Sequence, residues 1–225
     1  PLECTTNCAT NSPNSIAVLA AAPRGTLLHA PDCYMDKIAS GPELIGEVSL
    51  EGSVTWNLEQ AAFKLEKQIS ELNIVALDRE RHTQLFKEIN EAGAKLHLMP
   101  DGDISAALWA ADPNGPYDML LGIGAAPEGV ITATAIQGVG GVFEGRLQFK
   151  DSEEEQRASN MIDGDLHKVW KSTDLCTSDD ALFVATGVCS GYLPGVENTE
   201  KGIKTTSQII DVYNKDVKKI INFHL

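Results

Sequence analysis

Residues 117–130 read Tyr-Asp-Met-Leu-Leu-Gly-Ile-Gly-Ala-Ala-Pro-Glu-Gly-Val, and this stretch decides the fold. The largely apolar segment Tyr117–Leu121 predicts a buried strand, and the glycines after it predict a turn. Pro127 suits the first position of a helix, which we expect to extend to about Val139. A strand, a glycine-rich loop and a helix in this order are typical of an α/β layer.

Two similar strand–helix units precede this stretch. Ile74–Leu77 leads to a predicted helix over about 82–92, which Gly93 ends, and Lys95–Met99 leads to a predicted helix over about 103–111. Such alternation implies parallel strands joined by right-handed crossovers. The fold class that follows is an α/β layered domain.

The flanking segments give weaker signals. A hairpin is predicted for Ser15–Ala21 and Thr26–His29. Residues 31–41 are predicted to form a loop or a single helical turn that carries Tyr34, and a helix is expected to start at Asn57. Further expectations are a charged helical segment over 151–171, a buried strand over 181–186, and a terminal β pair over 203–212 and 217–223.

Composition limits the partners. The chain has 225 residues, 43% of them hydrophobic, and a formal net charge of −14. This charge argues against binding to nucleic acid or to an anionic membrane surface, and no apolar stretch reaches membrane-span length. A small phosphate ester remains compatible, because bound divalent cations can reverse the local sign of charge.

The cysteines are Cys4, Cys8, Cys33, Cys176 and Cys189. They form no CxxC pair and have no neighbouring histidine at zinc-site spacing. We interpret them as reduced thiols of a cytoplasmic protein, with a Cys4–Cys8 redox pair as the alternative.

Ligands of open parallel sheets bind where the carboxyl ends of the strands gather. Four loops are predicted to meet at that edge, namely Asp78–His82, Pro100–Asp103, Gly122–Glu128 and Gly187–Gly195. Arg79 and Arg81 suit bidentate phosphate contact, and the helix that follows Pro127 offers backbone N–H donors to phosphate oxygens.

Each of these features also has a purely structural interpretation. Asp101-Gly102-Asp103 is compatible with a turn and helix cap, and the two arginines with solvated surface charge. Glu128 can simply favour the positive end of its helix, and His82 and His97 can be packing or surface residues. The coincidence of several such loops at one predicted edge favours a functional site.

The chain opens on Pro1-Leu2-Glu3-Cys4-Thr5, a Pro-x-Glu-x-Thr segment whose expected leading Asp would lie before residue 1. Together with the lack of an initiator Met, this predicts that an N-terminal part of the gene product is absent.

Several motifs occur in the order found in one enzyme family. They are Pro1–Thr5, Leu19–Ala22, Ala30–Lys37, Asp78–His82, Pro100–Asp103, Gly122–Val130, Gly140–Leu147 and Ala185–Val188. With these motifs, the chain resembles the class II, GlpX-type fructose-1,6-bisphosphatases from residue 1 to residue 225.

The resemblance implies a layered sugar-phosphatase fold of the αβαβα sandwich type with its N-terminal part missing. Residues 1–52 would be the remainder of the N-terminal lobe, and residues 53–225 an α/β lobe with the substrate loops. It also implies Mn²⁺- or Mg²⁺-dependent removal of the 1-phosphate of fructose 1,6-bisphosphate, with sedoheptulose 1,7-bisphosphate as a substrate of some members. A cytoplasmic homo-oligomer, dimer or tetramer when full length, is the implied assembly.

The same resemblance assigns site residues. Glu3 and Glu128 would bind metal, and Thr5, with Glu3, would act on the attacking water. The implied substrate-binding residues are Glu3, Cys4, Thr5, Tyr34, Arg79, Glu80, Arg81, Asp101, Gly102, Asp103 and Ala125.

The chain departs from the family pattern at a few positions. Cys4 stands where Gly is usual, Glu80 replaces a Pro, Ala125 replaces a common Gly, and the loop 189–192 lacks the usual acidic Gly-Asp. Further metal carboxylates of the family would lie before Pro1, so we expect this chain alone to be weakly active or inactive. The alternative function is a non-catalytic sugar-phosphate-binding or assembly module; inositol-monophosphatase-like specificity fits the Asp-Arg-x-Arg-His loop less well.

Overall fold

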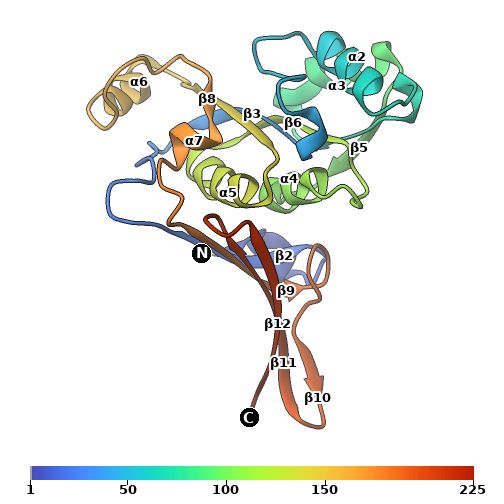
Figure 1. Ribbon diagram of the computed structural model, residues 1–225, viewed down its shortest axis with the longest axis vertical. Coiled ribbons are helices and arrows are strands. Elements are labelled where there is room, and N and C mark those ends of the chain that lie inside the picture. The colour runs from blue at the N-terminus through green and yellow to red at the C-terminus, as the bar shows by residue number, and fades with distance from the viewer. Residues whose placement is uncertain (1) are drawn as a thin grey trace.

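A computed structural model describes residues 2–225, which form two sheets with helices packed between them (Figure 1). The first sheet has the strand order β5-β4-β6-β3-β7-β8. Its strands are β3 (Tyr34–Ser40), β4 (Asn73–Leu77), β5 (Lys95–Met99), β6 (Met119–Ala125), β7 (Val142–Gln148) and β8 (Trp170–Lys171). β4 runs parallel to β5 and β6, as predicted from the strand–helix alternation.

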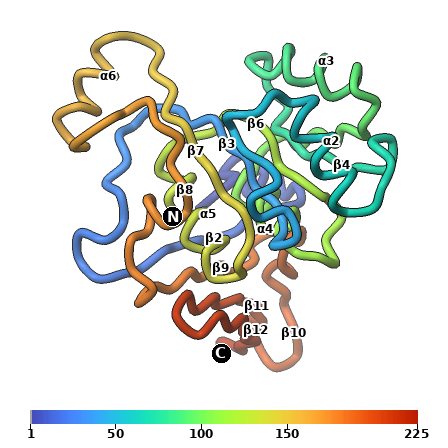
Figure 2. The backbone as a smooth tube through the Cα atoms, turned by 45° about the horizontal axis from the view of Figure 1, so that its top comes forward, coloured from blue at the N-terminus to red at the C-terminus, as the bar shows by residue number. Residues whose placement is uncertain are grey.

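The prediction of a loop over residues 31–41 is wrong, because Tyr34–Ser40 is the strand β3 at the centre of the sheet. β3 pairs antiparallel with both β6 and β7, and Figure 2 shows it passing between them. Adjacent charges at Asp36 and Lys37 interrupt the apolar run and hide the strand from a pattern search. Their compensation is tertiary: Asp36 lies opposite Arg146, and Lys37 bonds Asp103.

The second sheet joins the two ends of the described chain. It consists of β1 (Leu2–Glu3), β2 (Ser15–Ala21), β9 (Leu182–Cys189), β10 (Glu197–Thr199), β11 (Gly202–Asp211) and β12 (Asp216–His224). β2 pairs with β1 and β9, so the predicted hairpin with residues 26–29 is wrong; Leu27 makes only an isolated bridge to Cys176. The long ladder with β9 satisfies the backbone of β2 instead. The terminal β pair is confirmed as β11 and β12.

The helices are α1 (Thr5–Ala9), α2 (Val54–Lys64), α3 (Thr83–Ala92), α4 (Asp103–Ala111), α5 (Ala126–Val139), α6 (Ser152–Ser159) and α7 (Ser172–Leu175), with 3-10 turns at Pro42–Leu44, Ile69–Glu71 and Glu80–His82. The predicted boundaries of α3, α4 and α5 are confirmed to within one residue. α2 starts earlier than expected, because the Ser53 side chain caps it by accepting from the Trp56 N–H. The charged segment 151–171 is helical only over its first part, α6.

The layers follow the order helix, sheet, helix, sheet, which confirms the α/β layered class (Figure 1). α2 and α3 cover one face of the first sheet, and α4 and α5 fill the space between the two sheets. β4 shows how the sequence encodes this, since Ile74 packs on the α2 side whereas Val75 and Leu77 pack on the α4 and α5 side.

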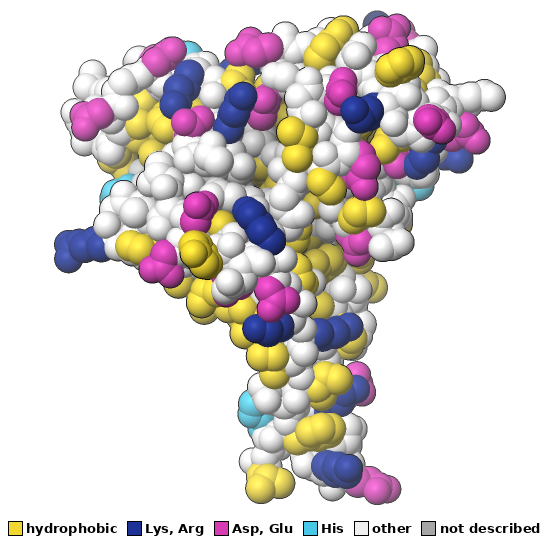
Figure 3. Space-filling model, viewed as in Figure 1, with side chains coloured by type: hydrophobic (Ala, Val, Ile, Leu, Met, Phe, Trp, Pro, Cys, Tyr) yellow, Lys and Arg dark blue, Asp and Glu magenta, His cyan; other side chains and the backbone are white. Residues whose placement is uncertain are grey.

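Both sheets contain strands from residues 2–52 and from residues 53–225, so the domain boundary at residue 52 stays a prediction. β10, β11 and β12 extend away from the layers as the narrow lower part of the molecule in Figure 3. Among residues 2–225, no helix has both the length and the apolar character needed to cross a membrane.

His82 connects two strand ends from inside the molecule. It is buried, its Nδ1 lies 2.7 Å from the Leu77 carbonyl oxygen, and its Nε2 lies 2.7 Å from the Ile123 backbone nitrogen. Because the Ile123 N–H can only donate, Nε2 accepts and the Nδ1–H donates to Leu77, which fixes the neutral ring in one tautomer. The interpretation of His82 as a packing residue is therefore confirmed.

This arrangement predicts a pH dependence of stability. Burial lowers the pKa of His82 below its ordinary value of 6.5. Just below pH 6.5, His82 is therefore protonated in the unfolded chain but still neutral in the folded chain. The free energy of unfolding should fall as the pH drops below 6.5, by at most about 1.4 kcal/mol per pH unit for this one group. Urea unfolding at several pH values from 7.5 to 5 measures this dependence. The free energy of unfolding should fall less steeply with pH in His82→Gln than in the unsubstituted protein, and an equally steep fall would contradict the prediction.

Candidate active site

The first sheet brings four strand ends to one edge. Because β4, β5 and β6 are parallel, their carboxyl ends Leu77, Met99 and Ala125 lie together. β3 runs the other way, so its first residue, Tyr34, reaches the same edge opposite Ala125. β1 of the second sheet closes this edge, since the Glu3 carboxylate accepts a hydrogen bond from the Ile104 N–H at 3.0 Å.

A cavity of about 340 Å³ opens at this edge. Its lining residues are Leu2, Glu3, Cys4, Thr5, Tyr34, Leu77, Arg79, Arg81, Asp101, Asp103, Gly124, Ala125 and Glu128. The structure thus brings together most of the sequence-predicted site residues, from segments distant in the chain. Of the predicted set, Glu80 and Gly102 do not line the cavity.

The two arginines are held in place by backbone carbonyl groups. Arg81 donates from Nε and Nη2 to the Ile123 oxygen at 3.0 and 2.7 Å, and its guanidinium carbon lies 4.7 Å from the centre of the Tyr34 ring. Arg79 donates to the Pro100 carbonyl at 2.5 Å and to the Asp101 carboxylate at 3.3 Å. Fixing both planar groups in this way lowers the entropy lost when they bind an anion.

The acidic side chains of the cavity are poorly compensated. Glu3 Oε2 and Glu128 Oε2 are both buried, and neither has a hydrogen-bond partner among residues 2–225. Burial, reinforced by the charge of Asp103, raises the pKa of Glu3 to about 8, although the Ile104 N–H and the charge of Lys37 act in the opposite direction. Buried carboxylate oxygens without partners are unfavourable unless a cation or a donor approaches them.

Cys4 adopts an unusual backbone conformation. Its φ of 59° and ψ of 54° are left-handed, a region that glycine occupies without strain, and it is only 4% exposed. A Cβ added to Gly102 would lie 2.8 Å from the Cys4 sulfur, so the thiol rests against the Asp101–Asp103 loop. Burial raises the pKa of the thiol, and the carboxylates of Glu3, Asp101 and Asp103 raise it further. All five cysteines are free.

Asp103 lies in the first turn of α4 and forms an ion pair with Lys37 at 2.5 Å. Lys37 is not among the predicted site residues, because the segment that carries it is predicted as a loop and its pairing with Asp103 is visible only in the tertiary structure. Gly124 makes room for this pair, because a Cβ there would lie 1.9 Å from Asp103 Oδ2. Gly102 supports the loop below the cavity with a φ of 97°.

The remaining predicted residues are Thr5, Tyr34 and Ala125, which line the cavity, and Glu80, which does not. Thr5 and Tyr34 are exposed, and Ala125 precedes α5 as its N-terminal capping residue. Glu80 is also exposed, and its carbonyl oxygen accepts a hydrogen bond from the Thr83 hydroxyl at the start of α3.

The expectation that the loop Gly187–Gly195 meets the other three loops is wrong. This loop follows β9, which belongs to the antiparallel second sheet rather than to the sheet with the parallel strand ends. Its link to the site runs through Asn14. The Asn14 Oδ1 accepts a hydrogen bond from the Tyr192 N–H, and the Asn14 side chain lies next to Gly102, where an added Cβ would contact it.

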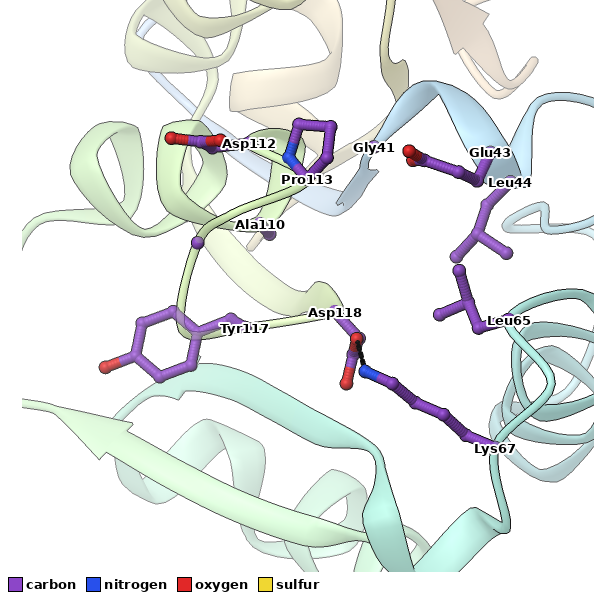
Figure 4. A pocket seen from close by; sticks show the side chains of 11 residues that line it. Gly41, Glu43, Leu44, Leu65, Lys67, Ala110, Asp112, Pro113, Tyr117 and Asp118 are labelled. Atoms are coloured by element: carbon purple, nitrogen blue, oxygen red, sulfur yellow. Dashed lines mark hydrogen bonds and ion pairs between the residues drawn. The ribbon is translucent and has the colours of Figure 1, made fainter.

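A second hollow lies at the opposite, amino end of β4 and β6 (Figure 4). Among the described residues that line it, the one cationic side chain, Lys67, already pairs with Asp118 at 2.5 Å, and Glu43 and Asp112 add negative charge. The hollow is therefore poorly suited to a phosphate ester.

Comparison with known proteins decides the family. The model of the family described as "Bacterial fructose-1,6-bisphosphatase, glpX-encoded" matches residues 1–224. The chain belongs to this family. The resemblance found in the sequence is thereby confirmed, and the chain is an enzyme of the phosphoric monoester hydrolase class.

Curated relatives in this bisphosphatase family carry a second substrate in their names. "D-fructose 1,6-bisphosphatase class 2/sedoheptulose 1,7-bisphosphatase" of Synechococcus sp. (strain JA-3-3Ab) is 39% identical over 239 residues, covering 100% of this chain and 69% of the relative. The protein of the same name from Thermosynechococcus vestitus is 37% identical over 241 residues, with the same coverage.

The left-handed geometry of Cys4 explains why glycine would suit this bisphosphatase segment. Cys4→Gly should retain equal or higher phosphatase activity and raise the free energy of unfolding by up to about 1 kcal/mol, since relief of strain exceeds the added chain entropy. Cys4→Val should lower the free energy of unfolding by about 1–3 kcal/mol, because a β-branched residue tolerates this φ poorly.

Urea unfolding and phosphate release by the two variants, made in parallel, test the prediction. A large loss of activity in Cys4→Gly with unchanged stability would mean that the thiol itself takes part in the reaction.

Proposed function

We propose that the cavity at the carboxyl edge of the first sheet hydrolyses the 1-phosphate of fructose 1,6-bisphosphate, giving fructose 6-phosphate and phosphate, with a divalent metal ion as cofactor. The observation that carries the proposal is the pair of buried carboxylate oxygens without partners, on Glu3 and Glu128, in one cavity with Arg79 and Arg81. The family of the chain and the names of its relatives support the choice of sugar bisphosphate.

The chemistry of the donor set fits Mn²⁺ or Mg²⁺. Glu3 and Glu128 provide hard carboxylate oxygens, which these ions prefer. Among residues 2–225, however, no group of three or more His, Cys, Asp or Glu side chains is arranged to hold a metal ion. A metal ion bound by these two carboxylates would keep other coordination positions for water and for substrate oxygens. When bound, the metal would polarise the phosphoryl group and offset the charge of the leaving oxygen.

The cavity also carries an excess of negative charge, which a bound divalent metal ion would offset. Four carboxylates line it, those of Glu3, Asp101, Asp103 and Glu128, against the guanidinium groups of Arg79 and Arg81. A sugar bisphosphate brings further negative charge, so divalent cations are needed to make its binding favourable.

The residues of the chain would divide the work of binding and proton transfer. The Thr5 hydroxyl, exposed at the start of α1, would orient the attacking water beside Glu3. Arg79 and Arg81 would hold the phosphate that is not cleaved. Cys4, Tyr34, Asp101, Asp103 and Ala125, which line the cavity, remain proposed contacts of the sugar and its phosphates, whereas Glu80 lies outside the lining.

The direct test is phosphate release from fructose 1,6-bisphosphate and from sedoheptulose 1,7-bisphosphate, each with Mn²⁺, with Mg²⁺ and with chelator. We expect release only with metal, and slow release from this 225-residue chain, because two carboxylates bind a divalent ion weakly. Metal-independent release would contradict the proposal. Fast Mn²⁺-dependent release would contradict the expected weakness and leave the chemistry supported.

Glu128→Gln separates metal binding from helix-end electrostatics. Loss of one carboxylate ligand should lower metal-dependent turnover by at least about 100-fold, since the metal supplies several kcal/mol of transition-state stabilisation. Glu153→Gln is the matched control, because Glu153 also lies in the first turn of a helix, α6, but on the exposed surface. Equal small effects of the two substitutions would reassign Glu128 to interaction with its helix dipole.

A non-catalytic sugar-phosphate-binding role is the second candidate, and strain at Cys4 is the observation that favours it. The exposed position of Glu80, away from the cavity lining, weakens it, because this added charge need not repel the substrate. We further propose a cytoplasmic homo-oligomer. Sedimentation of the purified protein would test the assembly.

A further inference from the structure

Lys37 is a fully buried charge in the centre of the first sheet. Its side chain is 1% exposed, and its ammonium group makes one hydrogen bond within residues 2–225, to Asp103 at 2.5 Å. Burying a lysine in the middle of a strand is costly unless the charge is compensated in place. Asp103, at the floor of the cavity, is that compensation, and its side chain is 12% exposed.

Glycines surround this pair. In the strand register, Lys37 lies between Gly122 of β6 and Gly145 of β7. A Cβ on Gly124 would approach Asp103 Oδ2 to 1.9 Å and Lys37 Nζ to 2.9 Å. A Cβ on Gly129 of α5 would lie 3.3 Å from Lys37 Cε. Gly124 of β6 and Gly129 of α5 therefore leave space for the lysine side chain, whereas a Cβ on Gly145 would meet Met35 instead.

The pair fixes one carboxylate of an otherwise crowded acidic site. Without the ammonium group, Asp103 would face Glu3 and Asp101 with no cation bonded to it, and its side chain would be free to rotate. Asp103 Oδ2 is held toward the sheet, which leaves the other oxygen for the cavity. A carboxylate held in one orientation can accept hydrogen bonds from sugar hydroxyl groups with little loss of entropy.

We propose that Lys37 is a positioning residue for the sugar phosphate, which acts from beneath the cavity by holding Asp103 in its binding orientation. The inference rests on the proposed function, because it names how that same site recognises its substrate. It assigns Lys37 no contact with substrate or metal.

The test uses Lys37→Met, which keeps the length of the apolar stem and removes the charge. We expect the Kd of fructose 6-phosphate, measured by calorimetry with Mn²⁺, and the KM of fructose 1,6-bisphosphate to rise by at least about tenfold. kcat should change by less than about threefold, because the reacting groups stay in place. Circular dichroism and urea unfolding verify that the variant is folded.

Lys67→Met is the matched control. Lys67 pairs with Asp118 at the same 2.5 Å separation, but in the hollow at the opposite end of the strands (Figure 4). This variant should bind fructose 6-phosphate like the unsubstituted protein. Equal weakening by the two substitutions would overturn the proposal, because a general loss of ion pairing would then explain both.

A double-substitution cycle isolates the route through Asp103. In an Asp103→Asn background, Lys37→Met should weaken binding by less than about twofold further, because the group that Lys37 positions has already been altered. An undiminished effect in that background would overturn the proposal, as would unchanged binding by Lys37→Met alone.

Gly124→Ala provides a second route if Lys37→Met does not fold. The added methyl group would displace Asp103 Oδ2 and crowd Lys37 Nζ, which disturbs the same ion pair without removing its charges, and binding should weaken to a similar extent. A folded Gly124→Ala with unchanged affinity would overturn the inference. If the unsubstituted protein binds fructose 6-phosphate but releases no phosphate, only the proposed function fails; if it binds no sugar phosphate, the inference on Lys37 fails.

Discussion

The antiparallel pairing of β3 with β6 is the constraint on which the rest of the site depends. It spans seven residue pairs, from Tyr34 opposite Ala125 to Ser40 opposite Met119. β4 and β5 are aligned with β6, so their loops reach the same edge as Tyr34. A shift of β3 by one residue would turn Lys37 to the other face of the sheet, away from Asp103. Strand register thus controls both the rim and the floor of the cavity.

The charges of the molecule are organised around this edge. The chain carries a net charge of −14, and its candidate active site is acidic as well. Arg79 and Arg81 are nevertheless fixed at the rim by backbone carbonyl groups, while Glu3 and Glu128 keep buried oxygens without partners. An acidic site that holds two fixed guanidinium groups is suited to an anion that binds together with a divalent cation. This combination is the physical basis of the proposed phosphatase chemistry.

Strain and space in the site also have identifiable causes. Cys4 holds a left-handed conformation because the chain must turn from β1 into α1 against the loop that contains Gly102. Gly124 serves a different purpose, since its missing side chain leaves room for a buried ion pair. A glycine at the position of Cys4 would relieve the strain, because glycine adopts this φ freely.

The sequence by itself determined the elements whose cause is local. The strand–helix alternation over residues 73–139, the terminal β pair and the polar loops after β4 and β5 are predicted from the sequence, since periodicity and punctuation by Gly and Pro depend on near neighbours. The loop predicted over Gly122–Glu128 is wrong, because β6 continues through both glycines to Ala125 and α5 starts at Ala126. The tertiary structure alone decided that 34–40 is a central strand and that Lys37 pairs with Asp103 of the cavity. Charges within a strand are stable only when a distant residue compensates them, and Asp103 lies 66 residues away in the chain.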